Sequence, residues 1–158
     1  NVGDYGSILN VMNNNENLSN HIAQPPISNN IDADCPFCNL DKNKFEVEDQ
    51  FSYVTGDLHP VTKLHMLVIP KRHIADFFGL ERTELISLYE LLQTARGKIQ
   101  QIDPTVTGFN VGTNSGTDAG QSVAHAHIHL IPRRNGDVSL TVNNPKGGVR
   151  WAVPTHRT

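Results

Sequence analysis

Three histidines at alternate positions are the residues of this sequence with the clearest potential for chemistry. They are His125, His127 and His129, in a run from Ser122 to Pro132 whose pattern predicts a strand. Successive side chains of a strand point to opposite faces, so we expect the three imidazoles on one face, at steps of about 7 Å. Each buried imidazole needs hydrogen-bond partners, which makes burial for stability alone costly.

Three interpretations of this cluster compete. The first is an exposed polar strand face that is rich in histidine by chance. The second is a catalytic metal site, because a His-x-His pair on a strand suits zinc or iron, although a further carboxylate or imidazole is then needed nearby. The third is covalent catalysis by one histidine, with the others orienting it and binding phosphate oxygens. We favour the third.

Two segments resemble signatures of the histidine triad (HIT) superfamily. One is His-Ala-His-Ile-His-Leu-Ile at 125–131, with Gly-Gln-Ser-Val before it and Pro-Arg after it. The other, at 57–73, is similar to the nucleoside-binding strand and turn of that family. The resemblance covers roughly residues 35–133, and the Gly-Gly-Val-Arg segment at 147–150 is similar to a C-terminal motif of the bacterial branch.

The resemblance implies an α+β, HIT-like fold: an antiparallel five-stranded sheet with one long helix and a short helix, dimerising into a continuous sheet. The apolar pattern predicts strands at 45–47, 51–55, 65–69, 108–112 and 122–132, and the long helix at 83–102. Closely spaced strands on both sides of a helix favour antiparallel pairing over parallel crossovers. We expect the helix to bury one face, made of Leu85, Leu88, Tyr89, Leu92, Ile99 and Ile102.

The resemblance also implies roles for individual residues. The middle histidine, His127, would attack the α-phosphate and form a nucleotidyl-histidine that water resolves, with its tautomer fixed by a hydrogen bond to the backbone carbonyl of His125. The substrate would be a dinucleoside polyphosphate such as diadenosine tetraphosphate, or a nucleoside phosphoramidate. The other expected site residues are His129 and His65 at phosphate oxygens or the leaving group, Asn114, Gln121 and Ser122 as neutral phosphate donors, and Asp57 as acceptor from the ribose hydroxyls.

One residue departs from the family pattern. The position before His65 is commonly Gly in that family, but here it is Leu64, preceded by Lys63. Leu64 must either avoid a positive φ or accept strain, so the shape of this turn is an open point.

The pair Cys35 and Cys38 has the two-residue spacing of half a zinc site. From the spacing alone, zinc binding, redox chemistry and an unconnected thiol pair all remain open. By resemblance to zinc-bearing bacterial members, His73 and His125 would complete a closed, structural Cys2His2 zinc site. We expect no organic cofactor, and magnesium at most as a companion of the substrate.

The charge and the hydrophobicity of the sequence limit the kinds of partner that the protein can bind. The formal net charge of -3 and the pI of about 6.2 provide no basic field for a long nucleic acid. No apolar run approaches the roughly 18 residues of a membrane span and no secretory signal is visible, so we expect a cytoplasmic protein with no membrane partner. The expected partners are a small nucleotide substrate and a second copy of the chain.

The chain length fits one domain, which we place at residues 34–158 with a C-terminal tail from about 138, after a flexible leader at 1–33. In the tail, Arg150 and Trp151 could close over a nucleotide. Arg133 and Arg134 could meet phosphate or form a solvated strand end, and His21, His59 and His156 are expected to be ordinary surface histidines. The rival functions are a nucleotide-binding regulator without turnover and a metal-dependent enzyme that uses the three histidines as ligands.

Overall fold

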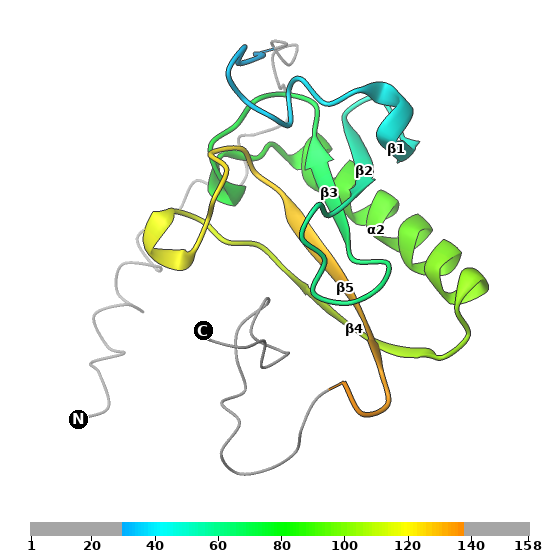
Figure 1. Ribbon diagram of the computed structural model, residues 1–158. Coiled ribbons are helices and arrows are strands. Elements are labelled where there is room, and N and C mark those ends of the chain that lie inside the picture. Colours follow the sequence, from blue (N-terminus) through cyan, green and yellow to red (C-terminus); the bar gives the residue numbers. More distant parts are fainter. Residues whose placement is uncertain (1–29, 138–158) are drawn as a thin grey trace, which may run out of the picture.

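The computed structural model describes residues 30–137, which form one antiparallel sheet with a long helix packed across one of its faces (Figure 1). The strand order is β1-β2-β3-β5-β4. The elements are β1 (Phe45–Glu48), β2 (Ser52–Gly56), β3 (Met66–Pro70), α2 (Arg82–Ile102), β4 (Val106–Gly112) and β5 (Ile128–Arg134), with short 3-10 helices η1 (Lys42–Lys44), η2 (Phe77–Gly79) and η3 (Thr117–Ala119).

This architecture confirms the expected α+β fold with five antiparallel strands and one main helix. Most of the expected leader and tail, including His21, Arg150, Trp151 and His156, lies outside the described residues. Within residues 30–137, no helix combines the length and apolar character that crossing a membrane requires.

The last strand differs from its prediction. It begins at Ile128, and residues 122–127, which the alternating pattern placed in the strand, lie before it outside any strand, with a bend at 123–125. Their backbone bonds elsewhere, because the Ala126 N–H donates to the Ile74 carbonyl at 2.7 Å and the His125 N–H donates to the Val123 carbonyl at 2.8 Å. The first two histidines of the triad therefore sit on a bent segment, and only His129 belongs to β5.

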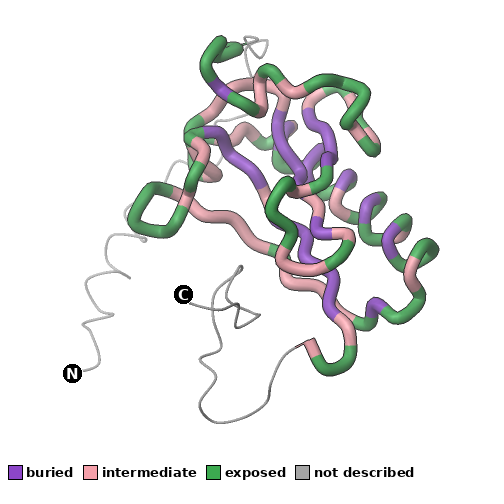
Figure 2. The backbone as a smooth tube through the Cα atoms, viewed as in Figure 1, coloured by how far each residue is buried: buried purple, intermediate pink, exposed green. Residues whose placement is uncertain are grey.

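The buried face of α2 also differs from its prediction. Leu88 and Ile99 are buried as expected, but Leu85, Tyr89 and Ile102 are exposed. The inward positions belong instead to Glu84, Ser87, Leu88, Leu91, Ala95 and Ile99, of which the apolar members pack against Val54, Val68, Val106 and Leu130 of the sheet. Figure 2 shows this burial along the central strands and one side of the helix.

Two buried polar residues explain the rotation of that face. Glu84 accepts from Arg72 through both carboxylate oxygens, at 2.8 and 2.7 Å, and the Ser87 hydroxyl donates to the Asp49 carboxylate at 2.8 Å. A buried carboxylate needs such partners, so these contacts determine which side of the helix faces inward. The Arg72 contact also ties the start of α2 to the segment after β3, which carries His73, and the Asp49 contact ties it to the loop between β1 and β2.

Candidate active site

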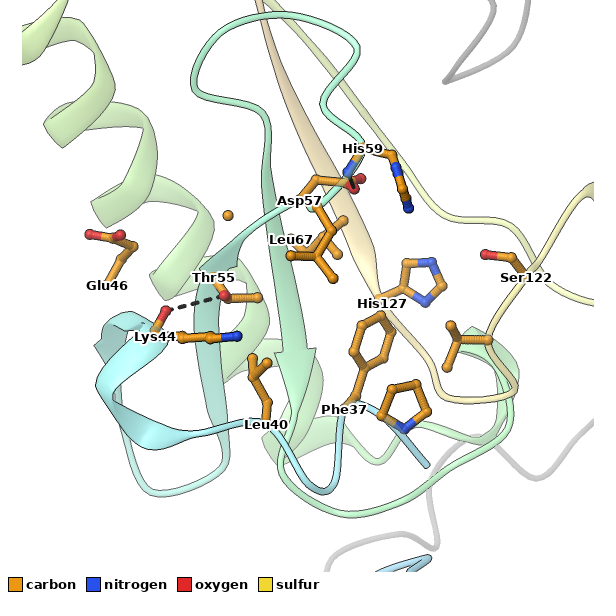
Figure 3. Close-up of a pocket in the computed structure, with 14 residues that line it drawn as sticks. Phe37, Leu40, Lys44, Glu46, Thr55, Asp57, His59, Leu67, Ser122 and His127 are labelled. Carbon is orange, nitrogen blue, oxygen red and sulfur yellow. Dashed lines mark hydrogen bonds between the residues drawn. The ribbon is translucent and has the colours of Figure 1, made fainter. Parts of the chain in front are cut away.

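His127 lies immediately before β5 and is buried, with its ring beside a cavity (Figure 3). Its Nδ1–H donates to the backbone carbonyl of His125 at 2.7 Å, which confirms the predicted bond. A neutral imidazole with its proton on Nδ1 keeps the lone pair on Nε2. The ring of Phe37 packs edge-on against it, with the centroids 5.2 Å apart.

A second group of side chains stands beside His127. The His65 Nε2 lies 3.0 Å from His129 Nδ1 and 3.4 Å from an oxygen of Asp57, and all three side chains are nearly inaccessible to solvent. The Val61 N–H donates to His65 Nδ1 at 3.1 Å, so a neutral His65 carries its proton on Nε2. A protonated nitrogen cannot ligate a metal, so this arrangement favours a hydrogen-bonded network over a metal centre formed by these residues.

Asp57 has two sets of contacts. One carboxylate oxygen accepts from the backbone N–H of His59 at 2.8 Å, and the other faces His65 and His129. The residue also lines the cavity that contains His127. Asp57 thus lies between the cavity and the histidine pair.

The three predicted phosphate donors are arranged differently from one another. Ser122 is exposed and lines the cavity near His127 (Figure 3). Gln121 braces the loop: its amide donates to the carbonyls of Ala75 and Val123, and its oxygen accepts from the Gly116 N–H. The Asn114 amide faces the Gly120 carbonyl at 3.4 Å. Of the three, only Ser122 lines the cavity.

The cavity has a volume of about 680 Å³. The apolar residues Phe37, Leu40, Leu58 and Leu67 form its walls. Figure 3 shows a histidine end, with His59, Ser122 and His127, and an opposite end with Lys44, Glu46 and Thr55. Sequence reasoning left these walls unassigned, because the cavity forms only where the segment of the cysteine pair, with Phe37 and Leu40, meets the 57–73 segment, with Leu58 and Leu67. His59 is exposed as expected, but it lines this cavity and is not an ordinary surface histidine.

The cysteine pair meets two histidines at the N-terminal side of the site. The Cys35 Sγ lies 3.3 Å from His125 Nδ1, and the Cys38 Sγ lies 3.5 Å from His73 Nδ1 and 3.6 Å from His125 Nδ1. The four donor atoms lie within 4.8 Å of one another. Two sulfurs and two imidazole nitrogens at this separation fit a tetrahedral zinc ion.

The surroundings of this cluster also suit a metal. The His125 Nε2–H donates to the Pro70 carbonyl at 2.9 Å, which turns the Nδ1 lone pair toward the sulfurs, and His73 Nε2 lies 3.6 Å from an Asp32 oxygen. Burial lowers the pKa of His125 to about 4 and so keeps the ring neutral. Burial also raises the pKa of the Cys38 thiol, and a bound cation would reverse that preference.

Leu64 resolves the open point about the turn before His65. Its φ of 69° makes it the one non-glycine residue of positive φ within residues 30–137. The His65 N–H donates to the Thr62 carbonyl at 3.1 Å and closes the turn, while the Leu64 side chain packs against the main core. That packing offsets a strain of about 1–2 kcal/mol.

The two arginines after the triad are structural in this arrangement. Arg133 is buried and donates to the Asp137 carbonyl at 2.8 Å, and Arg134 pairs with Asp103 at 2.7 Å. Neither lines the cavity.

The fold and this arrangement of histidines agree with comparisons to known proteins. The family model described as the HIT domain matches residues 40–136, so the chain belongs to the HIT family. The chain is 37% identical over 106 residues to the bis(5'-nucleosyl)-tetraphosphatase [asymmetrical] of Schizosaccharomyces pombe, covering 61% of this chain and 56% of that protein.

Two further proteins are similar over a larger share of their length. An adenosine 5'-monophosphoramidase of Candida albicans is 31% identical over 72% of this chain and 79% of its own. The crystal structure of a Zn-bound histidine triad family protein from Mycobacterium smegmatis superposes with a TM-score of 0.61 at 28% identity, over 75% of this chain and 88% of that one.

Proposed function

We propose that this protein is a nucleotide hydrolase or transferase that attacks the α-phosphate of a nucleoside phosphate derivative with His127. The observation that carries the proposal is the hydrogen bond from His127 Nδ1 to the His125 carbonyl beside the cavity, which places the lone pair of the neutral ring on Nε2. In the first step the Nε2–phosphorus bond forms, and the bond from phosphorus to the leaving group breaks. In the second step water forms a bond to phosphorus, and the imidazole leaves.

The substrate classes are dinucleoside polyphosphates and nucleoside phosphoramidates. The names of two relatives, a bis(5'-nucleosyl)-tetraphosphatase and an adenosine 5'-monophosphoramidase, correspond to these classes. A volume of about 680 Å³ has room for one nucleoside, which supports a site that holds one half of a dinucleotide.

The other residues have supporting roles. The His65–His129 pair meets the phosphate oxygens and gives a proton to the departing group, because His129 lies beside His127 with ring centroids 5.1 Å apart. Asp57 accepts from the ribose hydroxyls, and its place in the cavity wall supports this role. Ser122 donates to a phosphate oxygen, and Asn114 and Gln121 join it if the loop moves when substrate binds.

A structural zinc ion is the second part of the proposal. Cys35, Cys38, His73 and His125 would hold it as a closed tetrahedral site, and the ion would supply a fixed link between the N-terminal segment and the triad. The short donor separations and the Zn-bound relative support this assignment. His125 is then a metal ligand, and its carbonyl is the group that orients His127.

We further propose a homodimer with a continuous sheet. β4 is an edge strand of the described sheet, and Val111 on it is 55% exposed, so its backbone can pair with a second copy. Sedimentation should report the mass of two chains, and a monomer at micromolar concentration would contradict the pairing.

Incubation of the protein with adenosine and guanosine polyphosphates and phosphoramidates tests the proposed activity. Release of a nucleoside monophosphate is expected, and His127→Asn should lower kcat by about three orders of magnitude or more while nucleotide affinity changes little, because only the nucleophile is lost. Ser115→Ala, outside the cavity, is the matched control. Turnover that survives His127→Asn would overturn the proposal.

A further inference from the structure

The end of the cavity opposite His127 carries a lysine to which the proposed reaction gives no role. Lys44 ends η1 just before β1, and two hydrogen bonds hold its backbone: its N–H donates to the Asp41 carbonyl at 2.9 Å, and its carbonyl accepts from the Thr55 hydroxyl at 3.1 Å. Figure 3 shows its side chain running from this anchored backbone toward Leu40, which forms one of the apolar walls.

Within residues 30–137, no carboxylate pairs with the ammonium group of Lys44. Lys71, by contrast, pairs with Glu48, and Lys98 reaches the Glu46 carbonyl. The neighbouring cavity residues do not pair with this ammonium group either. The Thr55 hydroxyl donates its proton to the Lys44 carbonyl, and Figure 3 shows the Glu46 carboxylate turned away from the cavity. A cationic donor therefore lies at this end of the cavity, beyond the apolar walls.

The proposed reaction fixes the direction in which a nucleotide must lie. With the α-phosphate at His127 and the ribose near Asp57, the base extends between the apolar walls toward Lys44 (Figure 3). An ammonium group donates hydrogen bonds and accepts none. It complements the adjacent O6 and N7 acceptors of guanine, whereas adenine presents an amino donor in place of O6.

We propose that Lys44 reads the base and makes this a site for 6-oxopurine nucleotides, guanine and hypoxanthine, in preference to adenine. The inference rests on the proposed function for the direction of the nucleotide. A good contact between a lysine and guanine discriminates against a wrong base by about tenfold or more.

The test compares Lys44→Met, which keeps the length of the side chain and removes its charge, with Lys42→Met, a neighbouring lysine of η1 outside the cavity. The first measurement is kcat/KM for guanosine and adenosine 5'-phosphoramidates. The wild type and Lys42→Met should prefer guanosine about tenfold, and Lys44→Met should bring the ratio near one by losing guanosine activity alone. A ratio unchanged in Lys44→Met, or a wild-type preference for adenosine, would overturn the proposal.

A second measurement separates this proposal from the catalytic one. The dissociation constants of GMP, IMP and AMP are measured by calorimetry on His127→Asn, with and without Lys44→Met. GMP and IMP should bind about equally and about tenfold more tightly than AMP, only when Lys44 is present. If IMP binds as weakly as AMP, the site recognises the 2-amino group of guanine and not the 6-oxo group, and the proposal fails. Lys44-dependent binding without wild-type turnover would leave the base assignment standing and remove only the proposed activity.

Discussion

The chemistry of His127 depends on a hydrogen bond from its ring to the backbone carbonyl of His125. Because its Nδ1–H donates to the His125 carbonyl at 2.7 Å, the lone pair of the neutral ring lies on the opposite nitrogen, Nε2. This bond could be predicted from the spacing of the triad and its resemblance to a known family. Lys44 and Phe37 could not be, because their importance depends on a cavity that forms only when distant segments meet.

At the same scale, Asp57→Asn should raise KM by about 10- to 100-fold, because a charge-assisted hydrogen bond to the ribose contributes about 1.5–3 kcal/mol. Steady-state kinetics with a ribonucleoside substrate measures the effect. With a 2',3'-dideoxy substrate, the same substitution should have little further effect on KM. An equal loss with both substrates would mean that Asp57 acts mainly through His65 and His129, which face its other oxygen.

At the scale of elements, the strands and the length of α2 follow from apolar patterning, but the face of α2 does not. The helix was predicted to begin at 83 and begins at Arg82, yet it buries Glu84 and Ser87 where hydrophobicity favoured Leu85 and Tyr89. A sequence pattern assigns polar residues such as these to the exposed face of a helix, because the partners that allow their burial lie elsewhere in the chain. The last strand was predicted to begin at 122, six residues before Ile128, for the same reason, since the Ile74 carbonyl accepts a hydrogen bond from Ala126 that no local pattern reveals.

The buried ion pair between Arg72 and Glu84 should contribute to the stability of the fold. Arg72→Met should lower the free energy of unfolding by about 3 kcal/mol, because it leaves the carboxylate of Glu84, whose side chain is 1% exposed, without its cation. Denaturant titration measures this loss. The double variant Arg72→Met/Glu84→Met should recover part of it by removing the buried charge. A single variant as stable as the wild type would contradict the role given to this pair.

At the scale of the whole molecule, the cysteine pair, the segment after β3 and the triad converge on one cluster of four donors. Sequence spacing suggested the two sulfurs, whereas the histidines came from the family resemblance, since ligands from distant segments have no spacing of their own. A zinc ion at this cluster would link these three parts of the chain, and the position of the triad would then depend on that link.

Metal analysis should accordingly find one zinc per chain. Removal with a chelator, or Cys38→Ser, should lower Tm by roughly 10 °C, because the site loses its cross-link. Below the new Tm, the chelated protein should retain turnover, since the nucleophile needs no metal. Less than about a tenth of an equivalent of zinc with full stability would refute the site, and loss of turnover without unfolding would favour a catalytic metal.

The stereochemical course at phosphorus tests the central claim most directly. A substrate made chiral at its α-phosphorus with sulfur is hydrolysed in water enriched in oxygen-18, and the configuration of the nucleoside phosphorothioate product is determined. Each in-line displacement inverts phosphorus, so attack by His127 followed by attack by water predicts net retention. Net inversion would mean that water attacks phosphorus directly, and no nucleotidyl-histidine would lie on the path.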